Sequence, residues 1–481
     1  MKLINTLVIL RISGIILLIL TFSFLLCVPV AAIYKEPIAP FLISGAITMI
    51  LSFFLIGDFR KMTLSKITNR EGFIAVTVSW FIIILFGTLP FLISGSIPSF
   101  VNAFFESSSG FTTTGSSVIN DIEALPYSIL FWRSLTHWIG GLGIIVLMII
   151  VLPSLKITGY QLFRLESSLR EKLHPKTKAM GFRFLFIYLA ITVIETILLY
   201  AGEMNLFDSI CHSFATVATG GFSTKNTSLV DFSPYSQYVI TLFMFLSGVN
   251  YVVYYYLAKL NFRRIKINEE LWFYTVITVF SVVITTAILY TNNSGSFEET
   301  FREASFQVVS VISCTGFGSA DYLLWPSGAL LLLFFLMFAG GSMGSTSGGI
   351  KMARHLIALK NIKYIFVRLT HPNAIPMIKL NGNPLSQKVN ISIMSFIVLY
   401  IFIFMTGTII VMITGVDPVS SAGAVAASMA NLGPGLGSVG PMSNYEHLHS
   451  ITKIVLCLLM VIGRLEIYTV FILLTKSFWK L

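Results

Sequence analysis

The sequence predicts an all-α integral membrane protein made of two leading helices and four similar helix–re-entrant loop–helix units. Three observations support this fold class: an apolar composition, basic residues gathered on one side, and a fourfold internal repeat. Of the 481 residues, 55% are hydrophobic and 11% are charged, whereas roughly 25% are charged in ordinary globular domains. Such a composition argues against a soluble enzyme, a nucleic-acid-binding domain or a disulfide scaffold.

Ten segments are long and apolar enough to cross a bilayer, which takes about 20 residues. They are 7–33, 40–56, 72–94, 128–152, 182–200, 235–257, 271–289, 327–338 continuing to about 359, 389–414 and 451–475. The first could also be a cleaved signal peptide, because Lys2 and Arg11 give it a basic start. Its apolar run is longer than the apolar core of a usual signal peptide, which has about 7–15 residues, and no A-x-A cleavage site follows. We therefore expect this segment to be retained.

The basic residues set the orientation of these spans. If the N-terminus lies inside, almost all Lys and Arg residues fall on the inner side, and the exceptions are Lys35, Arg133, Lys225, Arg302, Lys453 and Arg464. This asymmetry follows the positive-inside rule and predicts that both termini are cytoplasmic. It also explains the net charge of +11 without a nucleic-acid partner.

Four segments repeat one pattern, a short amphipathic stretch followed by a turn of small residues. Aligning Thr-Thr-Gly, Ala-Thr-Gly, Cys-Thr-Gly and Asn-Leu-Gly puts one glycine of each in register: Gly115, Gly220, Gly316 and Gly433. Each unit has a span, a segment too short to cross, the glycine turn and a second span. The predicted domains are 1–57 for the two leading helices and 58–154, 155–259, 260–360 and 361–481 for the four pore repeats, with a broken second helix in the third.

Non-helical backbone at membrane depth is stable only where protein buries it or where it lines a wet cavity. Four glycine turns around one axis meet this condition by lining a central pore. Rings of backbone carbonyls can replace the water around a cation, and glycine permits the backbone angles that turn successive carbonyls inward. Each short helix would point its partially negative C-terminal end at the ion. The alternative, glycines that only allow close helix packing, does not explain four in register on one side.

The motifs SSGFTTTGSSVI, FWRSLTHWIGGLGI, ATGGFST, GGSMGSTSGGIK, NLGPGLG and GRLEIYT resemble those of the TrkH/KtrB/HKT superfamily of potassium transporters, most closely its TrkH-type subunits. The resemblance covers the whole chain. It implies K+ uptake through four pseudo-symmetric pore domains around one central pore in the bacterial cytoplasmic (inner) membrane. It also implies a homodimer regulated by a cytosolic nucleotide-binding ring like TrkA. The transported ion would be K+, with membrane lipid around the chain, no organic cofactor, no nucleic-acid partner and no enzymatic activity.

The resemblance assigns three consecutive residues of each repeat to a K+-binding filter. They are Thr113, Thr114 and Gly115; Ala218, Thr219 and Gly220; Cys314, Thr315 and Gly316; and Asn431, Leu432 and Gly433. In this alignment the residue before the glycine is threonine in three repeats and Leu432 in the fourth, which excludes a ring of four side-chain hydroxyls. Members that prefer Na+ tend to carry serine at the first glycine, so Gly115 favours K+.

A stretch rich in glycine and serine, 340–349, interrupts the second span of the third repeat. Its five glycines each cost about 1 kcal/mol relative to alanine in a helix. From the residues alone it is either a mobile polar loop across the pore or a static break filled by neighbours. The resemblance favours a gate made of Gly340, Gly341, Ser342, Gly344, Ser345, Thr346, Gly348 and Gly349.

Arg464 falls inside the last predicted span, where an ionisable residue is costly and functional by default. It either faces the pore and raises a barrier to cations, or it is neutralised by Glu466 or by carbonyls and holds helices together. Glu466 is two residues away and does not share its helical face, which favours the role as part of the gate.

Two other functional classes deserve comparison. A secondary carrier that couples K+ or Na+ entry to another ion by alternating access usually shows inverted halves and paired broken helices, whereas this sequence shows four units of one orientation and one long break. A membrane enzyme would need a nucleophile, base or metal set that the sequence lacks.

The basic inner loops 155–183 and 351–388 are either topology signals or docking sites for anionic lipid or an acidic partner. For the acidic partner, the resemblance suggests the TrkA-like ring.

Overall fold

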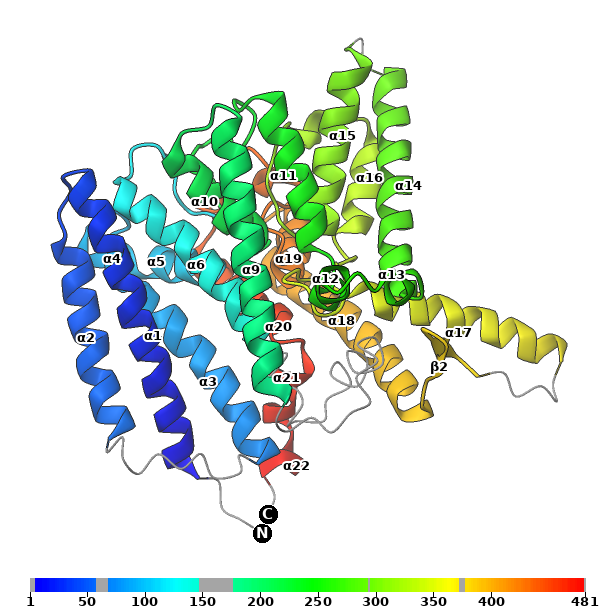
Figure 1. The fold of residues 1–481 in the computed structure, drawn as a ribbon, viewed down its shortest axis with the longest axis horizontal. Helices are drawn as coiled ribbons and strands as arrows, with labels where there is room; N and C mark the ends of the chain where they lie inside the picture. Colours follow the sequence, from blue (N-terminus) through cyan, green and yellow to red (C-terminus); the bar gives the residue numbers. More distant parts are fainter. Residues whose placement is uncertain (1–4, 58–67, 147–175, 293–294, 372–376, 480–481) are drawn as a thin grey trace.

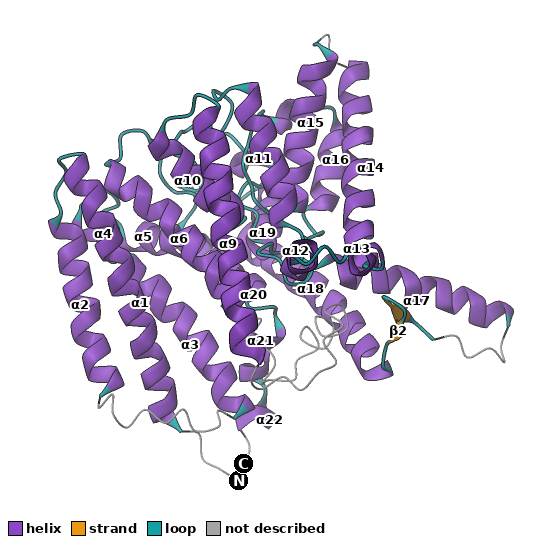
Figure 2. Ribbon diagram, in the orientation of Figure 1, coloured by secondary structure: helices purple, strands orange, loops and turns teal. Residues whose placement is uncertain are grey.

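The structure is a computed structural model that describes residues 5–57, 68–146, 176–292, 295–371 and 377–479. These residues are largely helical (Figure 2), which confirms the predicted all-α class. The strands among them form a small hairpin, in which β1 (Lys379–Leu380) runs antiparallel to β2 (Asn383–Pro384) with Lys379 opposite Pro384 and Leu380 opposite Asn383. Most of the predicted inner loop 155–183 lies outside the described residues.

Two leading helices, α1 (Thr6–Ile33) and α2 (Ala39–Ile56), pack side by side at one edge of the molecule (Figure 1). Small and polar residues lie between them: the Thr21 and Thr48 hydroxyls are 2.8 Å apart, and Ser52 Oγ donates to the Gly14 carbonyl at 2.7 Å. Such contacts are typical of helix pairs in lipid, where apolar surface alone gives no drive to associate. The outer face of α2 exposes Phe53 and Phe54, as expected of a lipid-facing surface.

The four repeats follow in chain order, each with a first span, a short helix and a second helix. The first spans are α3 (Asn69–Gly87) with α4 (Leu89–Ile93), α9 (Lys176–Ala201), α14 (Glu269–Asn292) and α18 (Gln387–Ile413). The short helices are α5 (Phe100–Phe111), α10 (Leu206–Val217), α15 (Phe297–Ile312) and α19 (Pro418–Ala430). The second helices are α6 (Tyr127–Val146), α11 (Pro234–Ser247) with α12 (Tyr251–Ala258), α16 (Ser327–Leu336), and α20 (Ser450–Arg464) with α21 (Tyr468–Phe471).

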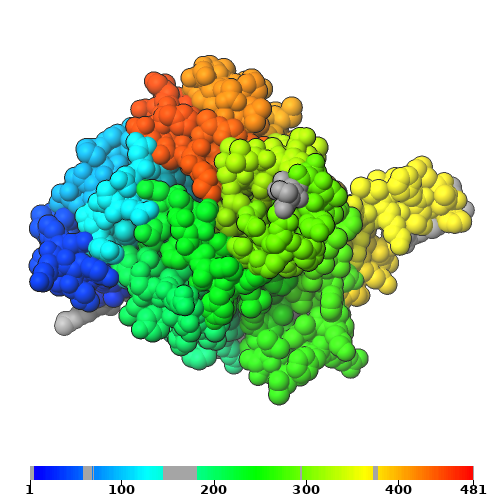
Figure 3. Space-filling view, turned by 90° about the horizontal axis from the view of Figure 1, so that it is seen from above, coloured from blue at the N-terminus to red at the C-terminus, as the bar shows by residue number. Residues whose placement is uncertain are grey.

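Seen from above, the repeats follow one another around the molecule in the order of the sequence (Figure 3). The short helices have 12 to 16 residues, fewer than the roughly 20 that a membrane crossing needs. Side-chain caps begin three of them: Asn205, Ser296 and Asp417 each accept a hydrogen bond from the backbone N–H three residues ahead.

The remaining elements are α13 (Phe262–Lys266), α17 (Met352–Thr370), α22 (Lys476–Trp479) and the 3-10 helices η3 (Tyr322–Leu324), η4 (Gly437–Val439) and η5 (Ile472–Leu474).

The span predictions were partly wrong in the second helices. Within the described ranges, six helices are long and apolar enough to cross a membrane, or up to eight if each bent pair counts as one span, against the ten predicted. The segment 235–257 bends by 97° between α11 and α12, and 451–475 bends by 105° after α20. The third-repeat break exists as predicted, but α17 projects to the side in Figure 1 instead of continuing α16. Residues 147–152 of the predicted span 128–152 are not described.

Local backbone chemistry explains the two unpredicted bends. Asn250 accepts a hydrogen bond from Val252 N at 2.9 Å and so starts a new helix, while the freed Tyr251 N–H donates to the Gly344 carbonyl at 3.1 Å. After α20, Glu466 and Ile467 have φ of 55° and 23°, which no α-helix accommodates. Neither bend contains the glycine-rich signature that marked the break in the third repeat.

Candidate functional site

The four short helices end in the same turn. A residue in the left-handed region comes first, and a glycine with positive φ follows two residues later. The left-handed residues are Thr113 (φ 51°), Thr219 (55°), Cys314 (57°) and Asn431 (53°), and the glycines are Gly115 (85°), Gly221 (80°), Gly316 (83°) and Gly433 (99°). The intervening residue donates its N–H to the carbonyl five residues back, at 2.8 to 2.9 Å in all four turns. This is the Schellman arrangement, which satisfies carbonyls at a helix end.

The structure corrects the predicted alignment of the second repeat by one residue. Gly221, not Gly220, is equivalent to the other three glycines, so the turn comprises Thr219, Gly220 and Gly221, and Ala218 is the C-cap of α10 with φ of −75°. The two consecutive glycines left the register ambiguous, and the backbone angles of Thr219 settle it. The residue before the equivalent glycine is therefore threonine in two repeats, Thr114 and Thr315.

The four turns form a closed ring. A Cβ added to Gly115 would lie less than 3.0 Å from the carbonyl oxygen of Gly220, and one on Gly221 would lie equally close to that of Thr315. Gly316 meets the Leu432 carbonyl in the same way, and Gly433 meets the Thr114 carbonyl. Each repeat thus packs its glycine on the middle residue of the next, and the fourth returns to the first. The turns encircle a common centre, and a side chain at any of these glycines would strike backbone.

A cavity of about 80 Å³ opens beside this ring. All four equivalent glycines line it, together with polar groups such as Ser117, Asn226 and Arg133. On the opposite side, the C-terminal ends of the short helices approach the first residues of the turns. The C-terminal ends of these helices add partial negative charge on that side.

The segment 340–349 meets the turns at their first residues. It is buried except for Gly349, which is half-buried. Thr346 Oγ1 donates to the Val217 carbonyl at the end of α10 at 2.9 Å, and Gly348 packs closely on the Ala430 carbonyl at the end of α19. The segment thus lies against short-helix ends from two repeats.

Several contacts that the sequence did not predict hold this loop. The carboxylate of Glu270, at the start of α14, accepts N–H groups from Met343 at 2.8 Å and Ala353 at 2.9 Å. The Gly248 carbonyl accepts from Ser342 N at 2.8 Å, and Lys351 Nζ donates to the Ser347 carbonyl. Lys351 looked like part of a basic inner loop, but it is 3% exposed. In the sequence, the position of Lys351 just after the glycine-rich stretch 340–349 is the feature that could have indicated its contact with the loop.

Arg464 is the last residue of α20, directly before the bend and not in the middle of a continuous span. It is 4% exposed. Its guanidinium donates to the Thr346 carbonyl of the loop at 2.7 Å and to the Gly140 carbonyl of α6 at 3.4 Å. Glu466 does not neutralise it, because Glu466 pairs with Arg354 of α17 at 2.6 Å. Arg464 therefore binds carbonyls, and one of them belongs to the predicted gate.

Comparisons with known proteins agree with this fold. The family model described as "TrkH: Cation transport protein" matches residues 39–480. "Trk system potassium uptake protein TrkH" of Escherichia coli (strain K12) is 36% identical over 98% of both chains, and the protein of that name from Vibrio parahaemolyticus serotype O3:K6 is 34% identical over 98% of this chain and 99% of its own. The "Crystal Structure of the Potassium Transporter TrkH from Vibrio parahaemolyticus" superposes with a TM-score of 0.90 and 32% identity, covering 99% of this chain and all of that one. This chain therefore belongs to the TrkH family of cation transport proteins.

Proposed function

We propose that this protein takes up K+ across the bacterial cytoplasmic membrane by channel-like permeation through the ring of four turns. The observation that carries the proposal is the closed ring, in which each glycine packs on a carbonyl of the next repeat. The related proteins named above are potassium uptake proteins, which supports K+ as the transported ion.

The residues around the ring offer the ligands that a dehydrated K+ needs. The filter we propose uses backbone carbonyls of Thr113, Thr114 and Gly115; Thr219, Gly220 and Gly221; Cys314, Thr315 and Gly316; and Asn431, Leu432 and Gly433. Rings of carbonyls replace ion hydration in selective channels. Among the described residues, the buried Thr113 Oγ1 and Asn431 Oδ1 have no hydrogen-bond partner, so two further oxygen atoms lie unsatisfied at the first residues of the turns.

We propose that the loop 340–349 and Arg464 form the gate of this pathway. Support comes from the Arg464–Thr346 contact and from the position of the loop against the ends of α10 and α19. A buried guanidinium near the axis raises the energy of a cation there, since like charges repel strongly in a low-dielectric interior. Opening would require the loop to leave these contacts and Arg464 to move with α20 or away from the loop.

A secondary carrier working by alternating access is the second candidate. The bends between α11 and α12 and after α20 favour it more than the sequence did, because carriers commonly use broken helices around a central site. In that case K+ or Na+ entry would depend on a second ion. A channel-like pathway would not need one.

The proposed partners are a second copy of this chain, a cytosolic nucleotide-binding ring like TrkA, and membrane lipid. The relatives belong by name to a Trk system. In this chain the exposed basic residues Arg263, Arg264 and Lys266 on α13 suit an acidic or anionic partner. The start of α1 and the end of α22 lie at the same end of the molecule (Figure 1), in line with two cytoplasmic termini.

Rb+ uptake into proteoliposomes that hold the purified protein tests the function. We expect uptake that K+ competes away far better than Na+, and that needs no imposed pH or Na+ gradient. Rescue of a K+-uptake-deficient bacterium on low K+ provides the cellular counterpart. Folded protein that transports neither ion contradicts the proposal, and uptake that depends strictly on a second ion supports the carrier.

A further inference from the structure

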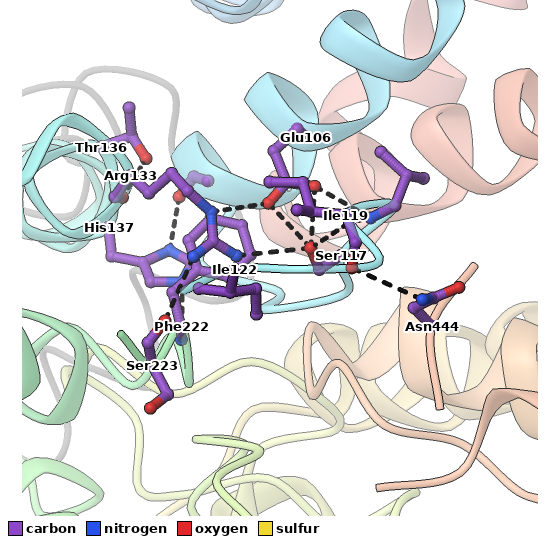
Figure 4. A network of polar contacts seen from close by, with 12 residues as sticks. Glu106, Ser117, Ile119, Ile122, Arg133, Thr136, His137, Phe222, Ser223 and Asn444 are labelled. Atoms are coloured by element: carbon purple, nitrogen blue, oxygen red, sulfur yellow. Dashed lines mark hydrogen bonds and ion pairs between the residues drawn. The ribbon is translucent and has the colours of Figure 1, made fainter. Parts of the chain in front are cut away.

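A buried ion pair lies directly behind the first turn. Glu106 on α5 and Arg133 on α6 are 2.8 Å apart, with side chains that are 0% and 1% exposed (Figure 4). Burying two charges costs more than their attraction returns unless further hydrogen bonds satisfy both groups. Both groups have such bonds, and all of them lead to the chain segments that leave the turns.

The pair joins the segment after the first turn to the segment after the second. Glu106 accepts from Val118 N at 3.0 Å and from Ser117 Oγ at 3.1 Å. Arg133 donates to the Ser223 carbonyl at 3.1 Å and to Ser117 Oγ at 3.3 Å. Its guanidinium also lies 4.1 Å from the centre of the Phe222 ring. These bonds span the junction where Gly115 packs on the Gly220 carbonyl.

Two of the other repeats support the same place with a histidine or a glutamine, and the fourth has no polar side chain there. Seven residues before each left-handed residue stand Glu106, His212, Gln307 and Ala424. His212 Nε2 bonds Ser223 Oγ at 3.0 Å, and Gln307 Nε2 donates to the Ala320 carbonyl at 3.1 Å. Ala424 has no polar side chain at all. The fold therefore does not require charge at this position, and the first repeat carries it for another reason.

We propose that Glu106 and Arg133 are positioning residues that set the preference for K+ over the smaller Na+. This inference rests on the proposed function. The pair fixes the spacing of the first and second filter segments, so the carbonyls at that junction do not close around a smaller ion. Arg133 also lines the cavity beside the ring, and Glu106 balances its charge there, which keeps cations from being repelled.

The test removes both charges together. In proteoliposomes, E106Q/R133Q is expected to keep Rb+ uptake but to lower the ratio of Rb+ to Na+ uptake about tenfold, which corresponds to ~1.4 kcal/mol. E106Q alone leaves Arg133 uncompensated, so Rb+ uptake itself falls, most at low ionic strength, and adding R133Q restores it. The matched control is E298Q, which breaks the partly exposed Glu298–Arg302 pair on α15 and is expected to leave the ratio unchanged.

A milder variant covers the case in which the double variant does not fold. S117A removes only the hydroxyl that Glu106 and Arg133 share, so it lowers the ratio in the same direction but less. A changed ratio at an unchanged melting temperature supports the proposal, because a purely structural pair would alter stability and not selectivity. An unchanged ratio in folded E106Q/R133Q overturns it, and so does an unchanged ratio in S117A if the double variant fails to fold. Wild-type protein without selective Rb+ uptake would instead refute the proposed function.

Discussion

The ring of turns and the loop 340–349 meet at the same helix ends, yet different kinds of contact hold them. The ring repeats one backbone geometry four times, and its glycines pack on carbonyls with no space for a side chain. The loop occurs once. Some of its glycines also pack on carbonyls, as Gly348 does on Ala430, and the side chains of Glu270, Lys351 and Arg464 hold it in addition. Moving one turn would disturb its neighbours in the ring, whereas the loop is not a member of that closed set. On the proposed function, the loop is therefore the movable part of the pathway and the ring is the rigid part.

Disrupting the ring is expected to have the largest effect. In G316A the new Cβ meets the Leu432 carbonyl in a left-handed backbone, so strain of about 1–2 kcal/mol adds to overpacking of about 1–3 kcal/mol. We expect loss of Rb+ uptake and a lower melting temperature. G382A is the control, because Gly382 also has positive φ but nothing within 4 Å. If both variants behave alike, the close packing of the ring has no functional role.

Removing the charge at the loop is expected to have the next largest effect, in the opposite direction. R464A removes the buried charge that contacts the loop. A fixed positive charge and a passing cation at a spacing of about 5 Å repel by ~3 kcal/mol at an effective dielectric constant near 20, so we expect K+ flux at fixed driving force to rise up to about 100-fold. Deleting part of 340–349 should act in the same direction. R302A serves as the control, because Arg302 is a half-buried arginine in the first half of α15 that pairs with the exposed Glu298. Unchanged flux in vesicles with normally expressed R464A would defeat the gate hypothesis.

Loosening one anchor of the loop should give a smaller increase in flux. E270Q weakens the two N–H bonds from Met343 and Ala353, each a charge-assisted bond worth about 1.5–3 kcal/mol. We expect a several-fold rise in Rb+ uptake with little change in the Rb+ to Na+ ratio, because the ring is untouched. The neighbouring E269Q is the matched control, since Glu269 pairs with Lys360 at the surface. A changed ion ratio in E270Q would show that loop and ring are not separable.

The smallest effect concerns acid pH and the helix α19. Hydrogen bonds from the side chain and backbone of Ser420 lower the pKa of Asp417, which caps this helix. A carboxyl whose folded pKa is lowered stabilises the fold above its unfolded pKa, and this contribution is lost as pH falls through the folded value. We expect D417A to cost about 1 kcal/mol at neutral pH. D417N should keep the cap but remove this part of the acid sensitivity, measured by thermal unfolding at pH 7 and pH 3. Equal acid sensitivity in D417N and wild type would contradict this assignment.

The predictions from sequence succeeded for features that recur along the chain and failed for features that depend on a single backbone angle or tertiary contact. Four glycine turns and a broken third-repeat helix follow from spacing and composition, since those signals need no partner. The register at Gly220 and Gly221 could not be predicted, because either glycine satisfies the motif and only the φ of Thr219 distinguishes them. The bend at Asn250 depends on the Gly344 carbonyl, which is far away in the sequence.

Composition and repetition alone determined that this chain is a helical membrane protein with four equivalent re-entrant turns. The length of each apolar segment and the recurrence of its glycine can be read from short stretches of sequence, because neither depends on a tertiary partner. The sequence also predicted that the turns surround one axis. Only the tertiary structure decided which carbonyl each glycine packs on, that Arg464 binds Thr346 while Glu466 binds Arg354, and that Glu106 pairs with Arg133. Buried charges and polar backbone groups find partners across the fold, and in a medium without water the choice of partner depends on which groups the packed helices bring within reach.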